Sequence, residues 1–257
     1  MPALRRSAAL AALSLLLAVP CRGQQTAASG GARVHAADPC AHPADRYGGA
    51  ARSDTTGRAY LSSFEQAMLD ALNAARTHPA AFAEHLVPLR SRFEGAILRR
   101  SGQPDLRTQE GVGAVNEAIR FLQSAEPLPP LVPSAGLSRA ARDHACDQGP
   151  KGQTGHTGSD GSSMTDRMDR YGRWVGMSGE NIAYGDYDPR GVVRQLIVDD
   201  GVPGRGHRDT IYKAAFRRVG LACAPHARYQ RICVMNVAAG FQEAAPDSSA
   251  SPSTSHR

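Results

Sequence analysis

The sequence has 257 residues, of which 41% are hydrophobic and 21% charged, with a formal net charge of +6. This length allows one large domain or two small ones, since a domain takes about 100–200 residues. The basic residues are spread along the chain with no dense Lys/Arg block, so the composition gives no support to nucleic acid binding.

The first 23 residues have the pattern of an export signal peptide. Arg5 and Arg6 form a basic start, residues 8–19 form an apolar run, and small residues follow up to Gly23. The run is shorter than the about 20 residues that a membrane-spanning helix needs, and no later segment supplies one. We therefore predict a secreted or periplasmic protein without a transmembrane span.

Cys21 raises the alternative of a lipid anchor near this cleavage point. Pro20 directly before the cysteine departs from the usual lipobox, so the anchor is the less favoured reading. Removal of the signal peptide would lower the net charge from +6 to +3, because three arginines and no acidic residue are lost.

Two segments flank a central domain and lack the apolar residues of a core. Residues 24–58 are rich in Ala, Gly, Ser, Arg and Asp, and we predict a flexible leader there. Residues 243–257 form a Ser/Pro-rich tail that we predict to be disordered. One domain remains at residues 59–242, and it contains no internal repeat.

Helices are predicted first along this domain. Ser62 and Glu65 form a capping box before a helix at residues 63–78, which Pro79 is placed to stop. Apolar spacing and caps predict further helices at residues 110–124, at residues 135–148 with an exit at Gly149, and from Asp188 to about Val198.

The pattern changes near the C-terminus to two β-branched, cysteine-bearing segments. Residues 216–224 (FRRVGLACA) and 231–241 (RICVMNVAAGF) are joined by a polar turn, which predicts a hairpin of buried strands. Helices followed by an antiparallel hairpin indicate an α+β fold and not a doubly wound sheet.

Export leaves four cysteines, Cys40, Cys146, Cys223 and Cys233, in an oxidising compartment. Cys223 and Cys233 flank the predicted turn, so their pairing is favoured among the three connectivities. Cys40 with Cys146 then follows by elimination. Free buried thiols are the alternative.

The segment 152–163 (GQTGHTGSDGSS) places His156 among glycines and small polar residues. Ser163 and Asp166 form a second capping box, for a short helix that ends at Gly172. Taken alone, the segment is typical of an exposed turn followed by a helix cap.

Two other glycine-bounded segments supply partners for His156. Glu180 lies in GENIAYG, and Asp199, Asp200 and His207 lie in DDGVPGRGHRD; both segments are predicted to be loops. Two neutral imidazoles with water can hold a divalent metal such as zinc, while the carboxylates orient the rings or act as a base. The spacing matches no local zinc motif such as HExxH.

Several other residues are assigned structural roles. His144 is expected at the core or its boundary, and His226 on the surface. Arg76 is expected to be a buried anchor whose fork satisfies several carbonyls. Tyr171 and Trp174 are expected to pack against the GHTG segment.

Taken in order, these segments resemble the CAP superfamily, also called SCP-like (cysteine-rich secretory proteins, antigen 5 and pathogenesis-related 1), and in particular a secreted bacterial member. The similarity covers about residues 60–242 and is carried by NAARTHPAAFA, LSRAARDHACDQ, GHTGSDGSS, GENIAYG, LIVDDGVPGRGHR and VGLACAPH…CVMNVAAGF. It implies a three-layer α–β–α sandwich with a central antiparallel sheet. It also implies a cleft of two histidines and two acidic residues that can hold a divalent metal.

By motif, the resemblance assigns His156 and His207 as metal ligands and Glu180 as the first acidic residue. The second acidic residue departs from the family pattern, which has a tryptophan and then a glutamate one turn later. Leu196 stands at the tryptophan position, which puts Asp199 at the glutamate position. Asp200 is the adjacent alternative.

Three functions are compatible with these residues. The favoured one is an exported module that binds a small-molecule, lipid or cell-envelope ligand, because two protein ligands are fewer than the three of a usual catalytic zinc site. The alternative is a metal-assisted hydrolase of peptide or envelope substrates, with Glu180 and Asp199 as catalytic residues. The third is a structural surface protein with a vestigial cleft.

Overall fold

The computed structural model describes residues 50–53, 59–185 and 188–245, all of which belong to one compact unit. The predicted signal peptide and Cys21 lie outside the described residues, as does Cys40 of the predicted Cys40–Cys146 pair. No helix in the described part of the chain is both long and apolar enough to cross a bilayer.

A four-stranded sheet forms the centre of the domain, in the order β6-β8-β9-β7. Its long strands are β7 (Gly172–Tyr184), β8 (Arg218–His226) and β9 (Gln230–Glu243), all paired antiparallel. The short β6 (Val132–Pro133) pairs parallel with β8, which is the one departure from the predicted antiparallel sheet. The predicted hairpin is therefore confirmed, and it is the core of the sheet.

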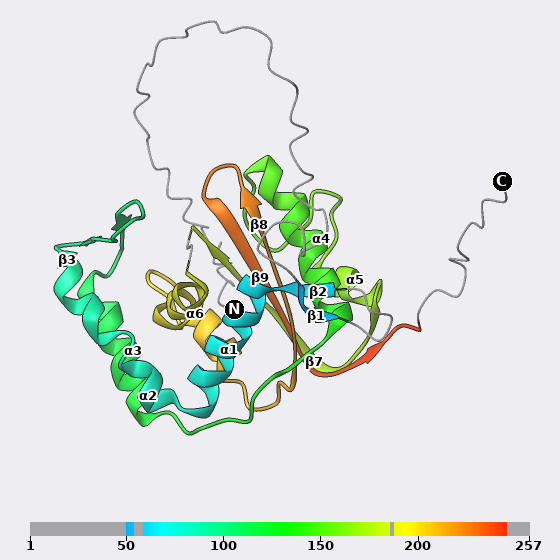
Figure 1. Ribbon diagram of the computed structural model, residues 1–257, viewed down its shortest axis with the longest axis horizontal. Coiled ribbons are helices and arrows are strands. Elements are labelled where there is room, and N and C mark those ends of the chain that lie inside the picture. The colour runs from blue at the N-terminus through cyan, green and yellow to red at the C-terminus, as the bar shows by residue number, and fades with distance from the viewer. Residues whose placement is uncertain (1–49, 54–58, 186–187, 246–257) are drawn as a thin grey trace, which may run out of the picture. The chain divides into compact units, whose positions relative to one another are not determined.

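Helices cover both faces of this sheet, as Figure 1 shows, and the predicted α–β–α sandwich is confirmed. One layer contains α1 (Ser63–Thr77) and α6 (Pro189–Val198), with α2 (Pro79–Ala83) and α3 (Val112–Ser124) packed outside them. The other layer contains α4 (Ala135–Lys151) and α5 (Met164–Asp169).

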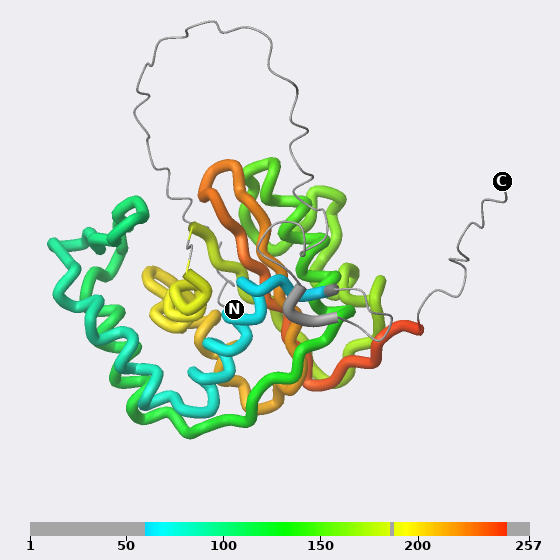
Figure 2. The backbone as a smooth tube through the Cα atoms, in the orientation of Figure 1, coloured from blue at the N-terminus to red at the C-terminus, as the bar shows by residue number. Residues whose placement is uncertain are grey.

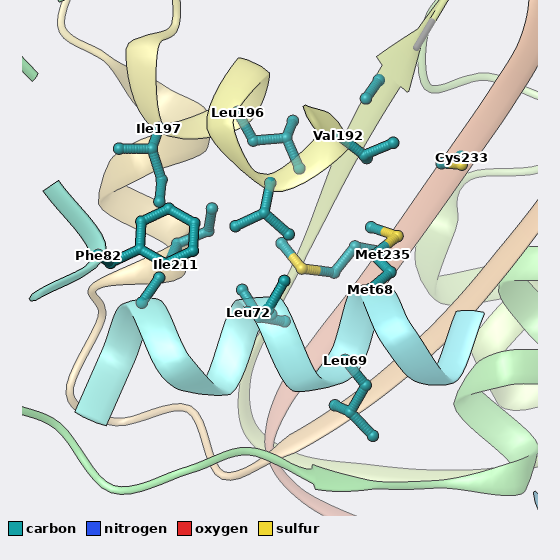
Figure 3. Close-up of a cluster of buried hydrophobic side chains, with 14 of the residues drawn as sticks. Met68, Leu69, Leu72, Phe82, Val192, Leu196, Ile197, Ile211, Cys233 and Met235 are labelled. Carbon is teal, nitrogen blue, oxygen red and sulfur yellow. The ribbon is translucent and has the colours of Figure 1, made fainter. Parts of the chain in front are cut away.

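Alternating side chains of β8 and β9 separate two cores. Leu221 and Met235 join the larger cluster beneath α1 and α6, whereas their neighbours Ala222 and Val234 join a smaller cluster beneath α4. Period-two alternation on a pleated strand produces this division. Figure 3 shows the larger cluster, where α1 and α6 meet over the sheet.

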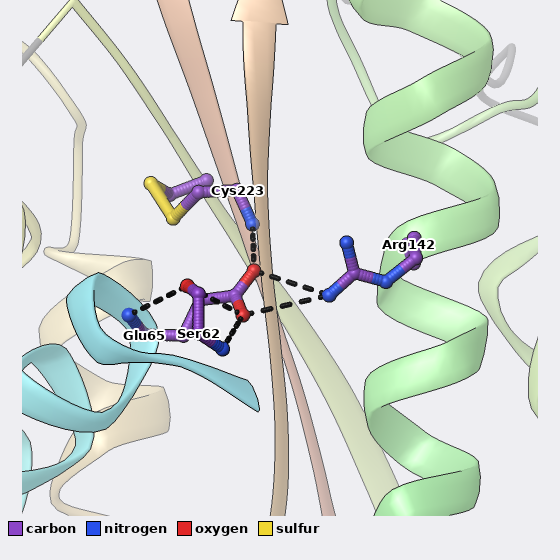
Figure 4. Close-up of a disulfide and its surroundings, with 5 residues drawn as sticks. Ser62, Glu65, Arg142 and Cys223 are labelled. Atoms are coloured by element: carbon purple, nitrogen blue, oxygen red, sulfur yellow. Dashed lines mark hydrogen bonds and ion pairs between the residues drawn. A yellow bond between two sulfur atoms is a disulfide. The ribbon is translucent and has the colours of Figure 1, made fainter. Parts of the chain in front are cut away.

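Glu65 joins three elements at the start of α1 (Figure 4). The predicted capping box with Ser62 is present, and the Glu65 carboxylate also accepts the Cys223 N–H of β8 at 2.8 Å. Arg142 of α4 donates to the same carboxylate at 3.3 Å. Because β6 pairs with only the first residues of β8, Glu65 satisfies a backbone donor that the sheet leaves free.

Arg76 at the end of α1 is fully buried and confirms its predicted role. Its guanidinium donates to the carbonyls of Pro129, Ile211 and Phe216. The end of α1 is thereby tied to the last residue of helix α7 (Gly206–Ile211) and to two positions outside regular secondary structure.

The predicted exit of α4 at Gly149 is wrong, because the helix continues to Lys151 and ends at Gly152 in the left-handed region, with φ of +64°. Gly149 instead allows close packing. A Cβ there would lie 2.3 Å from the carbonyl oxygen of Pro225 in β8. The glycine thus lets the last turn of α4 rest on the end of the hairpin.

A segment that the sequence analysis did not assign connects α2 to α3, and we call residues 87–109 the arm. It contains the 3-10 helix Val87–Arg92 and a small antiparallel sheet of β3 (Phe93–Glu94), β4 (Ile97–Leu98) and β5 (Leu106–Arg107). The arm extends away from the helices that cover the sheet (Figure 2).

The remaining elements are the paired strands β1 (Ala50–Ser53) and β2 (Ala59–Ser62), and the short helix α7 (Gly206–Ile211).

The predicted disulfide between Cys223 and Cys233 is present, at facing positions of β8 and β9. We expect replacement of both cysteines by serine to lower the free energy of unfolding by about 3 kcal/mol, because the cross-link closes a short loop in the unfolded chain. Denaturant unfolding of the wild type and the double variant measures this loss. Equal transition midpoints and slopes would contradict it.

Candidate functional site

A cleft of about 740 Å³ lies between the arm, α6 and the loops that carry the predicted site residues. Both His156 and His207 line it, together with Asp199 and Asp200. The structure therefore brings together two histidines that are 51 positions apart in the sequence. Apolar side chains of the arm and of α6 form much of the remaining wall.

A buried carboxylate contacts and orients the His156 ring. Its Nδ1 lies 2.9 Å from Oε1 of Glu180, whose side chain is only 2% exposed, while the His156 side chain is 58% exposed. Glu180 projects from β7 and not from a loop, so the loop predicted for GENIAYG is wrong. Continuous pairing of β7 with β9 from Ser178 to Tyr184 gives this carboxylate a rigid base.

Arg167 of α5 completes this half of the site. Its guanidinium, also 2% exposed, forms an ion pair with Oε2 of Glu180 at 2.9 Å. It also donates to the carbonyls of His156, at 3.1 Å, and Ser162, at 2.9 Å. Arg167 therefore positions both the carboxylate and the loop whose imidazole the carboxylate orients.

His207 has an equivalent arrangement with Asp199. Its Nδ1 lies 2.6 Å from one carboxylate oxygen of Asp199, and its backbone N–H donates to the other at 2.9 Å. Asp199 is the C-cap of α6 and has a left-handed φ of +52°, which aspartate tolerates better than most residues. His207 lies in the first turn of α7, where a loop had been predicted.

Asp200 has a different role from its neighbour. Its carboxylate accepts the backbone N–H groups of Gln109 and Glu110, at 2.7 and 2.8 Å. Arg205 adds to this junction by pairing with Glu110 at 2.6 Å and donating to the Asp199 carbonyl at 2.7 Å. Of the two candidate carboxylates, Asp199 contacts the histidine, and Asp200 joins the arm to the loop.

The hydrogen bonds determine which imidazole nitrogen is free. A ring nitrogen that faces a carboxylate carries the proton, so in neutral His156 and His207 the lone pair is on Nε2. No described residue forms a hydrogen bond to either Nε2. Carboxylate–imidazole pairs of this kind are the usual support of metal-binding histidines.

The donor set fits a divalent metal only in part. Two imidazole nitrogens are available, and the described residues contain no group of three or more His, Cys, Asp or Glu arranged to hold a metal ion. A bound ion would therefore take two protein ligands, and solvent or another ligand would fill the other positions.

The GHTG loop is also fastened to α4. Nε2 of His144 and the Gln148 amide both donate to the Gly155 carbonyl at 2.8 Å, and the Gly155 N–H donates to the Tyr184 hydroxyl at 3.1 Å. Burial lowers the pKa of His144, which keeps its ring neutral, and raises the pKa of Tyr184 to about 12. The predicted core position of His144 is confirmed.

Two of the structural assignments are wrong. His226 is buried, not exposed, because its Nδ1 accepts the N–H groups of Arg228 and Tyr229 and thereby closes the β8–β9 turn. Tyr171 and Trp174 pack against the cluster of α4 and α5 that contains Met168. The GHTG loop is supported by α4 instead.

Several contributors to the site were missed. Arg167 pairs with Glu180 13 positions away and Arg205 with Glu110 95 positions away, and no local spacing signals such ion pairs. The sequence contains one weak indication of the role of Arg167, because this residue lies in the short capped helix that directly follows the loop of His156.

The geometry agrees with one family. The model of the Cysteine-rich secretory protein family (CAP) matches residues 69–237, which is more than half of the chain. The chain belongs to the CAP family. All four residues of the two histidine–carboxylate pairs lie within the matched range of this CAP domain.

Two solved structures are similar to the chain at low identity. An outer surface protein from Borrelia burgdorferi is 18% identical, with a TM-score of 0.37, over 46% of this chain and 80% of the other. An extracellular SCP-domain protein from Bacillus anthracis str. Ames is 20% identical, with a TM-score of 0.35, over 43% of this chain and 34% of the other. No curated protein matches the chain.

Proposed function

We propose that this CAP domain binds a divalent metal, zinc in the first instance, through Nε2 of His156 and His207. We further propose that it is an exported module that binds an extracellular or cell-envelope ligand in the cleft beside the metal. The supporting observation is that both imidazoles line one cleft and are oriented through Nδ1 by nearly buried carboxylates. Export rests on the signal-peptide pattern of residues 1–23.

Ligand binding fits the carboxylates better than hydrolysis does. A metal, when bound, supplies Lewis acidity and lowers the pKa of its water, but hydrolysis also needs a base within reach of that water. Glu180 is engaged by Arg167 and His156, and both oxygens of Asp199 are engaged by His207. A metal-assisted hydrolase, the alternative, would have to break one of these arrangements to use either residue as a base.

Zinc titration by calorimetry tests the metal site. We expect the wild type to bind one zinc ion, and His156→Ala and His207→Ala each to weaken binding strongly, since each removes one of two protein ligands. His85→Ala removes an exposed histidine outside the cleft and should bind as the wild type does. Equal binding by all four proteins would overturn the assignment.

The two adjacent aspartates provide a finer comparison in the same titration. We expect Asp199→Asn to weaken zinc binding by about 10–100-fold, because it weakens the support of the His207 ring. Asp200→Asn should change it far less, since Asp200 contacts the backbone of the arm. An equal loss of zinc affinity in the two variants would contradict the distinct roles of Asp199 and Asp200.

Turnover separates the two functions. Hydrolysis of a peptide or envelope-fragment library by the zinc-loaded wild type, lost in Glu180→Gln, would establish the hydrolase. Ligand retention without turnover supports the binding module.

A further inference from the structure

Five arginines line the same cleft as the two histidines. They come from the arm, from α6 and from the β8–β9 turn, namely Arg92, Arg100, Arg107, Arg194 and Arg228. Among the residues that the structure describes, only Asp199 and Asp200 supply carboxylates to the same lining, and both already accept hydrogen bonds from the protein. The lining of the cleft is therefore cationic.

Two of these arginines have no partner in the described part of the chain. Arg92 and Arg107 are exposed, and neither side chain forms a hydrogen bond or ion pair with a described residue. Arg99 on the same arm differs, because it lies between Glu94 and Asp105 at 2.6 and 2.5 Å. Arg99, which does not line the cleft, is thus neutralised within the arm, whereas Arg92 and Arg107 line the cleft with free guanidinium groups.

Two apolar residues that line the cleft are chain neighbours of these arginines. Phe93 follows Arg92, and Leu106, which is 39% exposed, precedes Arg107. All four residues line the cleft, as does Leu196 of α6. A purely polar polyanion would leave these apolar side chains in water, whereas an apolar group beside the anion would cover them.

We propose that the arm makes the cleft selective for a ligand with an anionic head, a carboxylate or a phosphate, joined to an apolar body. Arg92 and Arg107 bind the head through charge-assisted hydrogen bonds, and Phe93 and Leu106 cover the apolar part. The cleft volume is in the range that holds a molecule of this size. This inference rests on the proposed ligand-binding function and identifies its ligand class and its specificity-determining residues.

Paired probes test the selectivity in the absence of metal. We expect dodecanoate and dodecyl phosphate to bind the EDTA-treated full chain at least tenfold more tightly than dodecanol, which has the same apolar body without charge. Arg92→Gln combined with Arg107→Gln should remove this preference and leave dodecanol binding unchanged. Arg90→Gln is the matched control, since Arg90 is an exposed arginine of the same arm that does not line the cleft.

Further comparisons identify whether the anionic ligand is a lipid surface or a free amphiphile, and which results would overturn the proposal. Binding of phosphatidylglycerol vesicles but not phosphatidylcholine vesicles would assign the anion to a lipid surface, and binding of the monomers alone would assign it to a free amphiphile. Equal binding of dodecanol and dodecanoate, an equal loss in Arg90→Gln, or tighter binding of inorganic polyphosphate would overturn the proposal. His156→Ala with His207→Ala should still bind dodecanoate, so failure of the metal site is distinguishable from failure of the arm.

Discussion

Arg167→Leu should lower the free energy of unfolding by about 3–5 kcal/mol, the usual loss when one partner of a buried ion pair is removed. Arg167 and Glu180 are each only 2% exposed, and their charged groups lie 2.9 Å apart. Without the guanidinium, the Glu180 carboxylate stays buried without the cation of its ion pair. The carbonyls of His156 and Ser162 lose their donor as well.

Denaturant unfolding measures this loss, and a second variant identifies its cause. Arg167→Leu combined with Glu180→Leu should recover part of the stability, since no buried charge then lacks a partner. Arg170→Leu, three residues away, removes an arginine whose ion pairs with Asp143 and Asp160 are partly exposed, and should cost at most about 1 kcal/mol. An Arg167→Leu effect as small as that of Arg170→Leu would refute the buried pair.

Glu65→Ala should have a comparable effect, again of about 3–5 kcal/mol, at the start of α1. The Glu65 carboxylate accepts the N–H groups of Ser62 and Cys223 and pairs with Arg142 (Figure 4). Its removal leaves the Cys223 N–H of β8 buried without an acceptor and abolishes half of the capping box. The junction of α1, β8 and α4 depends on this one side chain.

Asp70→Ala is the matched control for this variant, because it removes an exposed carboxylate from the same helix. It should change the free energy of unfolding by less than about 0.5 kcal/mol. Glu65→Gln should fall between the two, since an amide keeps one acceptor for the N–H groups but loses the charge that pairs with Arg142. A Glu65→Ala protein as stable as Asp70→Ala would show that the junction does not depend on the carboxylate.

Local signals in the sequence predicted the elements whose evidence lies within a few residues. The two capping boxes, Ser62–Glu65 and Ser163–Asp166, are both present, because such a box needs only residues three positions apart. The Cys223–Cys233 hairpin follows from two β-branched segments and the turn between them. The order of the motifs was enough to identify the family, and it pointed to His156 and His207, which line one cleft.

Contacts between residues far apart in the sequence determine the features that local sequence patterns missed or predicted wrongly. GENIAYG looks like a loop because glycines bound it, yet pairing with β9 makes it part of a strand and aims Glu180 at His156. Gly149 looks like a helix end, but it is required for packing against Pro225.

The site itself shows the same division. Both histidines could be named from their motifs, but Asp199 and Asp200 are neighbours of equal charge and only their surroundings distinguish them. The left-handed turn at the end of α6 directs Asp199 to His207, while Gln109 at the end of the arm, 91 positions earlier in the chain, engages Asp200. A hydrogen bond or ion pair depends on distance in space, and local sequence patterns report only neighbours along the chain. Residue types and local elements were therefore predictable, whereas the pairing of the charged groups was settled only by the packed domain.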